Sequence, residues 1–134
     1  MNRITLGKLF ELYVDIFDKF GLHLLTERDQ IINYYVLEVT DISIGYCSDR
    51  ILVKFLENGM IDERIYEVSQ IFLKKFRKLE TVMLTWDAES IKNSSNWKKL
   101  MEMSDNIKGM IRIKWTEEEL KEIFKFEQPV NLEI

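Results

Sequence analysis

The chain has 134 residues, of which 46% are hydrophobic and 31% charged, and its net charge is −4. This length and apolar content predict a single compact domain over residues 1–134 with a real hydrophobic core. One proline and five glycines leave little room for linkers. The composition therefore argues against disorder, except at the C-terminal tail.

The cellular compartment is suggested by the cysteine content and by the N-terminus. A single cysteine, Cys47, excludes an internal disulfide and suits a reducing compartment. Charged residues at Lys8, Glu11 and Asp15 interrupt the apolar run that a signal peptide needs. No run of about 18 apolar residues is present that would cross a membrane. We expect a cytoplasmic protein with no membrane partner.

Acidic residues are concentrated in the first half of the chain. Residues 1–67 carry seven Lys and Arg against twelve Asp and Glu, whereas residues 68–134 carry twelve against eleven. Nucleic-acid binding needs a basic surface to replace counterions, so this balance argues against direct nucleic-acid contact. It fits a basic protein partner better. For any single carboxylate, a role in solubility alone is the simpler explanation.

The N-terminal third begins with a helical pattern. Apolar residues recur at helical spacing over residues 5–20, and we expect Gly21 to end that helix in a left-handed conformation. Residues 29–39 are rich in β-branched and aromatic residues, which favours a strand. A helix beginning near Thr26 and Asp29 is the alternative, because these two residues fit a capping box.

The next segment predicts a β-hairpin followed by a long helix. Residues 42–46 and 51–56 read as two short strands around a polar turn, and Asn58-Gly59 marks the turn after them. Asp62 is expected to cap a helix that continues to about Leu79. The inner face of this helix consists of Ile65, Val68, Phe72, Phe76 and Leu79.

Two further features of this helix bear on function. Ile71 and Leu73 widen its apolar face, which permits a homodimer. Four basic residues crowd the expected end of the helix, namely Lys74, Lys75, Arg77 and Lys78. We interpret them as complementing the negative end of the helix dipole rather than as a phosphate or nucleic-acid site.

The stretch from Glu80 to Trp115 reads as strand, helix, strand. The expected strands are residues 81–86 and 107–115, with a helix between them that is capped by Ser94 or Ser95. Such a unit normally forms a right-handed parallel crossover. With the antiparallel meander before it, the pattern predicts an α/β (α+β) fold with a mixed β-sheet of four to five strands and helices packed on the sheet.

The C-terminal part predicts one more helix. Thr116 and Glu119 form a capping box for it, and Glu117 and Glu118 complete an acidic first turn. Residues 128–134 alternate after the chain's one proline and are either an edge strand or a frayed tail.

Residues that could carry catalysis are few. The single histidine, His23, has no evident nucleophile partner, and one His with one Cys (Cys47) makes a poor zinc site. Asp87 and Glu89 follow an expected strand and represent the best carboxylate pair for an enzyme, although a role in the turn is the simpler interpretation. We predict no catalytic residues, no metal and no cofactor.

The three tryptophans, Trp86, Trp97 and Trp115, mark the ends of the expected central elements. Large aromatic residues close protein cores and also anchor protein interfaces, and sequence alone leaves both roles open.

A small, acidic, cysteine-poor domain without a catalytic set has the general profile of bacterial immunity proteins and antitoxins. We therefore expect an inhibitor that occludes the active site of a basic toxin, such as a nuclease. The alternatives are a phage-encoded inhibitor or a regulatory or structural subunit, and then a carboxylate-based enzyme. The residues expected to bind the partner lie in or beside turns. They are Asp41, Asp49, Glu57, Asp62 and Glu63.

Overall fold

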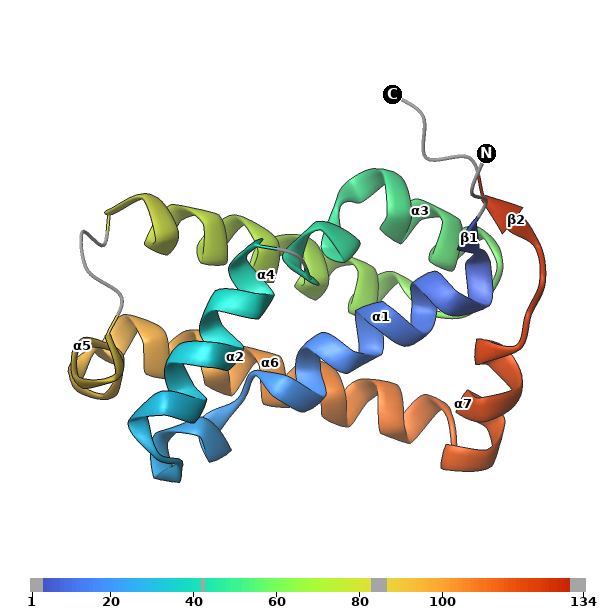
Figure 1. Ribbon diagram of the computed structural model, residues 1–134. Coiled ribbons are helices and arrows are strands. Elements are labelled where there is room, and N and C mark those ends of the chain that lie inside the picture. Colours follow the sequence, from blue (N-terminus) through green and yellow to red (C-terminus); the bar gives the residue numbers. More distant parts are fainter. Residues whose placement is uncertain (1–3, 42, 83–86, 131–134) are drawn as a thin grey trace.

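The computed structural model describes residues 4–41, 43–82 and 87–130, and this part of the chain is almost entirely helical (Figure 1). Its α-helices are α1 (Leu6–Lys19), α2 (Asp29–Asp41), α3 (Asp49–Glu57), α4 (Glu63–Val82), α5 (Ala88–Asn93), α6 (Ser95–Lys114) and α7 (Glu117–Phe124). Two 3-10 helices, η1 (Leu22–Thr26) and η2 (Ser43–Cys47), and two short strands, β1 (Ile4–Thr5) and β2 (Pro129–Val130), complete it.

The expected α/β fold is therefore wrong. Within the described residues the β1–β2 pair is the only sheet, so the mixed sheet of four to five strands is absent there. In place of the expected hairpin over 42–56 stand η2 and α3, with residue 42 outside the described residues. The expected strand 107–115 belongs to α6 as far as Lys114. Residues 29–39 lie in α2, which was the alternative interpretation. The expected strand 81–86 overlaps the end of α4, and its residues 83–86 lie outside the described residues.

The burial pattern of α6 explains the error. A strand over 107–115 would place Ile107, Ile111 and Ile113 on one face, because side chains alternate with a period of two. In α6, Ile107 and Ile111 are buried four positions apart, whereas Ile113 is 88% exposed. The β preference of isoleucine is a weak bias, and burial of a helical face outweighs it.

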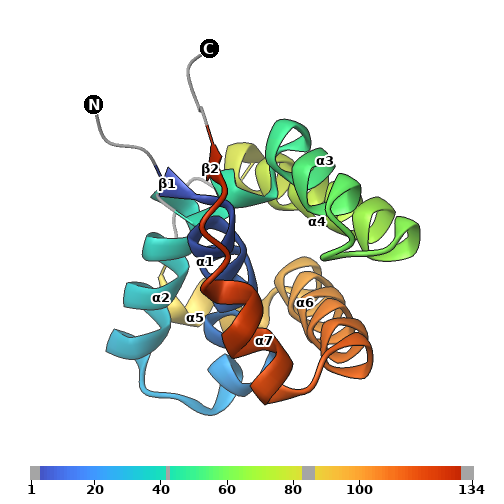
Figure 2. The ribbon, with the colours of Figure 1, turned by 90° about the vertical axis from the view of Figure 1, so that its right-hand side faces the viewer.

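Helix α1 lies at the centre of the molecule, with α2, α3, α6 and α7 around it (Figure 2). The helix predicted over residues 5–20 is confirmed, and the Thr5 hydroxyl caps it by accepting a hydrogen bond from the Lys8 N–H at 3.2 Å. Eight of its residues are buried: Leu6, Gly7, Leu9, Phe10, Tyr13, Val14, Ile16 and Phe17. A helix buried on this scale needs neighbours on several sides, which explains its position.

Gly21 follows α1 in an extended conformation, with a φ of −175°, so the expected left-handed end is wrong. The need for a glycine at this position comes instead from the lack of room for a side chain. A Cβ atom on Gly21 would lie 2.3 Å from the Asp105 carboxylate of α6. The same carboxylate accepts a hydrogen bond from the Leu22 N–H at 3.2 Å, so the chain passes close to α6 at this point.

The C-terminal segment closes the beginning of α1. Strand β2 pairs antiparallel with β1, with Ile4 opposite Val130. The N–H groups of Leu6 and Gly7 donate to the carbonyls of Gln128 and Phe126 at 2.7 and 3.0 Å. The first turn of a helix has no partners of its own for these N–H groups, so the C-terminal segment supplies them.

The turn and cap signals from Gly59 onward are confirmed. Gly59 has a φ of +72° in the turn between α3 and α4, and Asp62 accepts a hydrogen bond from the Ile65 N–H at 2.8 Å. Ser94 caps α6 through the Trp97 N–H at 3.3 Å. Thr116 and Glu119 form the complete capping box of α7.

Candidate functional site

Four of the five carboxylates expected to bind a partner lie on the hairpin formed by α3 and α4. Asp49 begins α3 and Glu57 ends it, while Asp62 and Glu63 stand at the start of α4. All four side chains are exposed. Asp41 is the last residue of α2, and its side chain lies outside the described part of the structure.

Two of these carboxylates have structural roles in the hairpin. Asp49 accepts hydrogen bonds from the Tyr66 hydroxyl and from the Gln70 amide, the latter at 2.7 Å, and so ties α3 to α4. The hydrogen bond to Asp49 also raises the pKa of the Tyr66 phenol. Asp62 caps α4. Glu57 and Glu63 form no hydrogen bond or ion pair through their side chains within the described residues, so they are the more available for a partner.

Sequence reasoning missed Glu67 on the same surface. It is exposed and lies one helical turn after Glu63 in α4. The signal was present, because both residues fall on the helix that was predicted from Asp62, but Glu67 lies beyond the turn in which partner-binding carboxylates were expected. From Asp49 to Glu67 the chain carries five acidic and three basic residues. The hairpin is therefore acidic by a modest excess.

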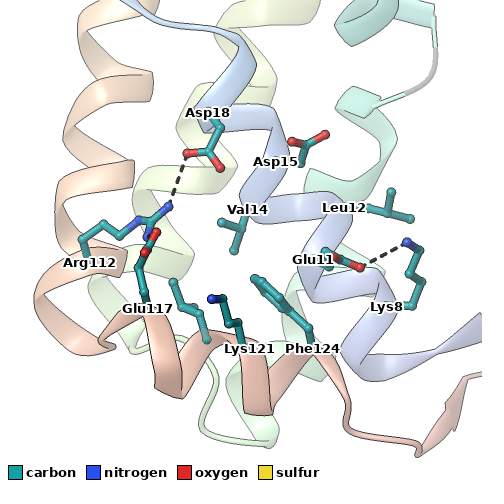
Figure 3. Close-up of a pocket in the computed structure, with 11 residues that line it drawn as sticks. Lys8, Glu11, Leu12, Val14, Asp15, Asp18, Arg112, Glu117, Lys121 and Phe124 are labelled. Atoms are coloured by element: carbon teal, nitrogen blue, oxygen red, sulfur yellow. Dashed lines mark hydrogen bonds and ion pairs between the residues drawn. The ribbon is translucent and has the colours of Figure 1, made fainter.

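A cleft of about 400 Å³ lies between α1 and α7 (Figure 3). Its charges pair with one another across the helices. Arg112 of α6 contacts Asp18 of α1 at 3.6 Å and Glu117 of α7 at 3.1 Å. Lys108 reaches Asp18 at 3.2 Å. These ion pairs connect α1, α6 and α7. We therefore interpret the charged residues of the cleft as stabilising the packing of these helices rather than as binding a ligand.

The residues considered for catalysis lie in ordinary structural positions. His23 is exposed in η1, whereas Cys47 is fully buried in η2. Asp87 caps α5 by accepting a hydrogen bond from the Ser90 N–H at 2.7 Å, and this hydrogen bond lowers the pKa of the carboxyl. Glu89 lies in the first turn of the same short helix. In the part of the chain that is described, no group of three or more His, Cys, Asp and Glu residues is arranged to hold a metal.

The tryptophans divide between core and partial exposure. Trp97 is fully buried. Trp115 is half-buried, and its indole N–H donates to the Met60 carbonyl at 2.8 Å. Trp86 lies outside the described residues. Trp97 therefore belongs to the core, whereas part of Trp115 faces solvent.

Burial raises the pKa of the Cys47 thiol well above its usual range, and this predicts a dependence of stability on pH. Because the folded-state pKa is the higher one, the thiol's contribution is complete below the unfolded-state pKa of about 8.5 and is lost as the pH rises. Between about pH 7.5 and 9.5 the free energy of unfolding should fall by roughly 1.3 kcal/mol more in the wild type than in Cys47→Ala.

Urea unfolding of both proteins at the two pH values measures this difference. Cys47→Ala also leaves a small cavity, which lowers stability equally at both pH values and so does not affect the comparison. Equal pH slopes in the two proteins would show that the thiol is not buried.

No helix within the described residues is both long and apolar enough to cross a bilayer. No protein-family model, no curated protein and no solved structure matches this chain.

Proposed function

We propose that this protein is a small acidic inhibitor of the bacterial immunity type, which neutralises a basic toxin, such as a nuclease, by covering its active site. One observation carries the proposal: exposed carboxylates project from a single helical hairpin, and other residues of that hairpin fix its shape. The exposed carboxylates without a structural partner in the described residues are Glu57, Glu63 and Glu67.

The rigidity of this surface favours binding. Asp49, Tyr66 and Gln70 join α3 to α4 through side-chain hydrogen bonds, and Gly59 supplies the left-handed turn between the helices. A preformed surface loses little conformational entropy when it binds. Acidic side chains on it attract a basic partner before contact and suppress acidic competitors.

An exposed apolar pair also lies on α2, on the other side of α1 from the α3–α4 hairpin (Figure 2). Tyr34 and Leu37 are 63% and 56% exposed, and they lie three positions apart, so they share one helical face. Interfaces obtain much of their affinity from aromatic and aliphatic anchors of this kind, while surrounding charges set the association rate. The pair lies outside the proposed contact surface, and we assign the hairpin carboxylates to the rate of association.

The test begins with purification of the tagged protein from its own host. Mass spectrometry then identifies the proteins that copurify with it. We expect one stoichiometric basic protein that is toxic when expressed alone and harmless when this chain is co-expressed. A partner that is not toxic, or the absence of a stoichiometric partner, would contradict the proposal.

Charge reversal on the hairpin is expected to slow association with that partner. Glu57→Lys combined with Glu63→Lys should lower the association rate constant about tenfold at low salt, and the salt dependence should become flatter. The matched control is Glu118→Lys with Glu127→Lys, two exposed residues in and after α7 that change the net charge by the same amount. Stopped-flow mixing at several salt concentrations measures both pairs.

If the two pairs slow association equally, the net charge of the molecule steers binding and the hairpin is not the contact surface. If neither pair has an effect, the acidic-surface mechanism is wrong. Asp49 is left unchanged in this test because its reversal would break the bonds to Tyr66 and Gln70.

A further inference from the structure

A second concave surface lies toward the other end of α4, and it is basic. A cleft of about 300 Å³ opens between the second half of α4 and the first half of α6. Its lining residues are Lys75, Lys78, Leu79, Asn96, Lys99, Leu100 and Met103. The three lysines are exposed, whereas Leu79 and Leu100 are buried. The cleft therefore has a cationic rim and an apolar floor.

The helix dipole does not explain these lysines. The basic run of α4 was expected to complement the negative end of the helix, but α4 continues to Val82 and has no basic residue in its last described turn. The influence of the dipole falls off beyond that turn. Lys99 is the fifth residue of α6, past its first turn and far from its negative end, so the dipole does not account for this lysine either.

Like charges face the cleft from both of its walls. Lys75 comes from α4 and Lys99 from α6, and the repulsion between these two ammonium groups opposes the packing of the two helices. Neither Lys75 nor Lys99 forms an ion pair with a residue whose side chain is described. An anion in the cleft would offset this repulsion.

We propose that this cleft binds a small phosphorylated molecule, with its phosphate at the lysine rim and its apolar body on Leu79, Leu100 and Met103. Lysine ammonium groups bind phosphate as point charges, and the Asn96 amide adds a hydrogen-bond donor at the start of α6. The cleft volume of about 300 Å³ lies at the lower end of the range for small-molecule sites. The inference is independent of the proposed inhibitor function.

A small molecule fits better than a nucleic acid. Polynucleotide binding draws its affinity from many phosphate contacts along a basic track. This chain has a net charge of −4, and the lining of the cleft combines cations with an apolar floor. Such a combination suits a ligand that has one anionic end and one apolar end.

The test uses three probes on the full chain at low ionic strength: 4-methylumbelliferyl phosphate, its uncharged parent 4-methylumbelliferone, and inorganic phosphate. We expect the phosphate ester to bind at least about tenfold more tightly than either fragment, because only the ester contacts both rim and floor. Titration calorimetry measures affinity. Amide shifts in the NMR spectrum should map to the α4 and α6 residues that line the cleft.

Two charge-reversal pairs separate the cleft from the general surface charge. Lys75→Glu with Lys99→Glu should weaken binding of the ester at least about tenfold. Lys74→Glu with Lys98→Glu changes the net charge equally, on the same two helices, at exposed neighbouring positions outside the cleft, and should change affinity less than about threefold. Lys75→Gln with Lys99→Gln serves as a milder second pair if the first loses its helical circular-dichroism signal.

Three results would overturn the proposal. The first is that the ester binds no more tightly than its uncharged parent. The second is that both charge-reversal pairs weaken binding of the ester equally. The third is that a single-stranded oligonucleotide binds more tightly than the ester and loses affinity equally in both pairs, which would indicate a diffuse nucleic-acid surface.

Discussion

Replacement of Trp97 with alanine is expected to lower the free energy of unfolding by about 3–5 kcal/mol. Trp97 of α6 is fully buried, and its ring lies 6.0 Å from Phe20 and 5.7 Å from Phe76, measured between ring centroids. These contacts join the end of α1 to α4 and α6. Loss of the indole removes the apolar contacts and leaves a cavity where the three helices meet.

Urea unfolding followed by circular dichroism measures the effect, and the melting temperature should fall by roughly 10–20 °C. Trp97→Phe is the matched control, because it keeps an aromatic ring against Phe20 and Phe76 and should cost only about 1–2 kcal/mol. Equal losses in the two variants would show that the aromatic contacts are not what Trp97 contributes.

Replacement of Gly7 with alanine is expected to destabilise the protein by about 2–3 kcal/mol, although alanine is the better helix former. A Cβ atom on Gly7 would lie 2.5 Å from the Phe124 carbonyl oxygen and 2.7 Å from that of Ile123. These are backbone atoms at the end of α7, so they cannot move aside as a flexible side chain would. The new methyl group would push α7 away and strain the Gly7–Phe126 hydrogen bond.

Gly109 provides a control of opposite sign. It lies inside α6, and a Cβ atom there would have no neighbour within 4 Å. Gly109→Ala should therefore stabilise the protein by about 0.5–1 kcal/mol through helix propensity alone. Chemical denaturation of both variants gives the comparison. Stabilisation by Gly7→Ala would show that α7 does not pack against the start of α1.

Local signals could be read from the sequence because the interacting groups are close neighbours in the chain. The caps at Asp62, Ser94 and Thr116 each join a side chain to an N–H group three residues later. The left-handed turn at Gly59 depends on one residue and its missing side chain. No tertiary contact is needed for any of these, so they could be predicted from the residues alone.

Tertiary packing explains the secondary structure of residues 29–41, 43–56 and 107–114. Ile51, Leu52 and Phe55 are apolar enough for a strand, but as a helix they bury one face against the core. There the ring centroid of Phe55 lies 5.1 Å from that of Phe10 in α1. β propensity differs between residues by at most about 1 kcal/mol, and burial of a large side chain contributes about 1.5–3 kcal/mol. A distant helix therefore overrides the local preference.

The same distinction applies to the candidate sites. The sequence determined that Asp49, Glu57 and Glu63 are carboxylates in a chain of net negative charge. The tertiary structure decided that Asp49 bonds to Tyr66 and Gln70, 17 and 21 residues away, while Glu57 and Glu63 remain available. It also brought Lys75 and Lys99 to one cleft. Which charges meet depends on how helices far apart in the chain pack, because charges that are remote in sequence interact strongly only when packing brings them within a few ångströms.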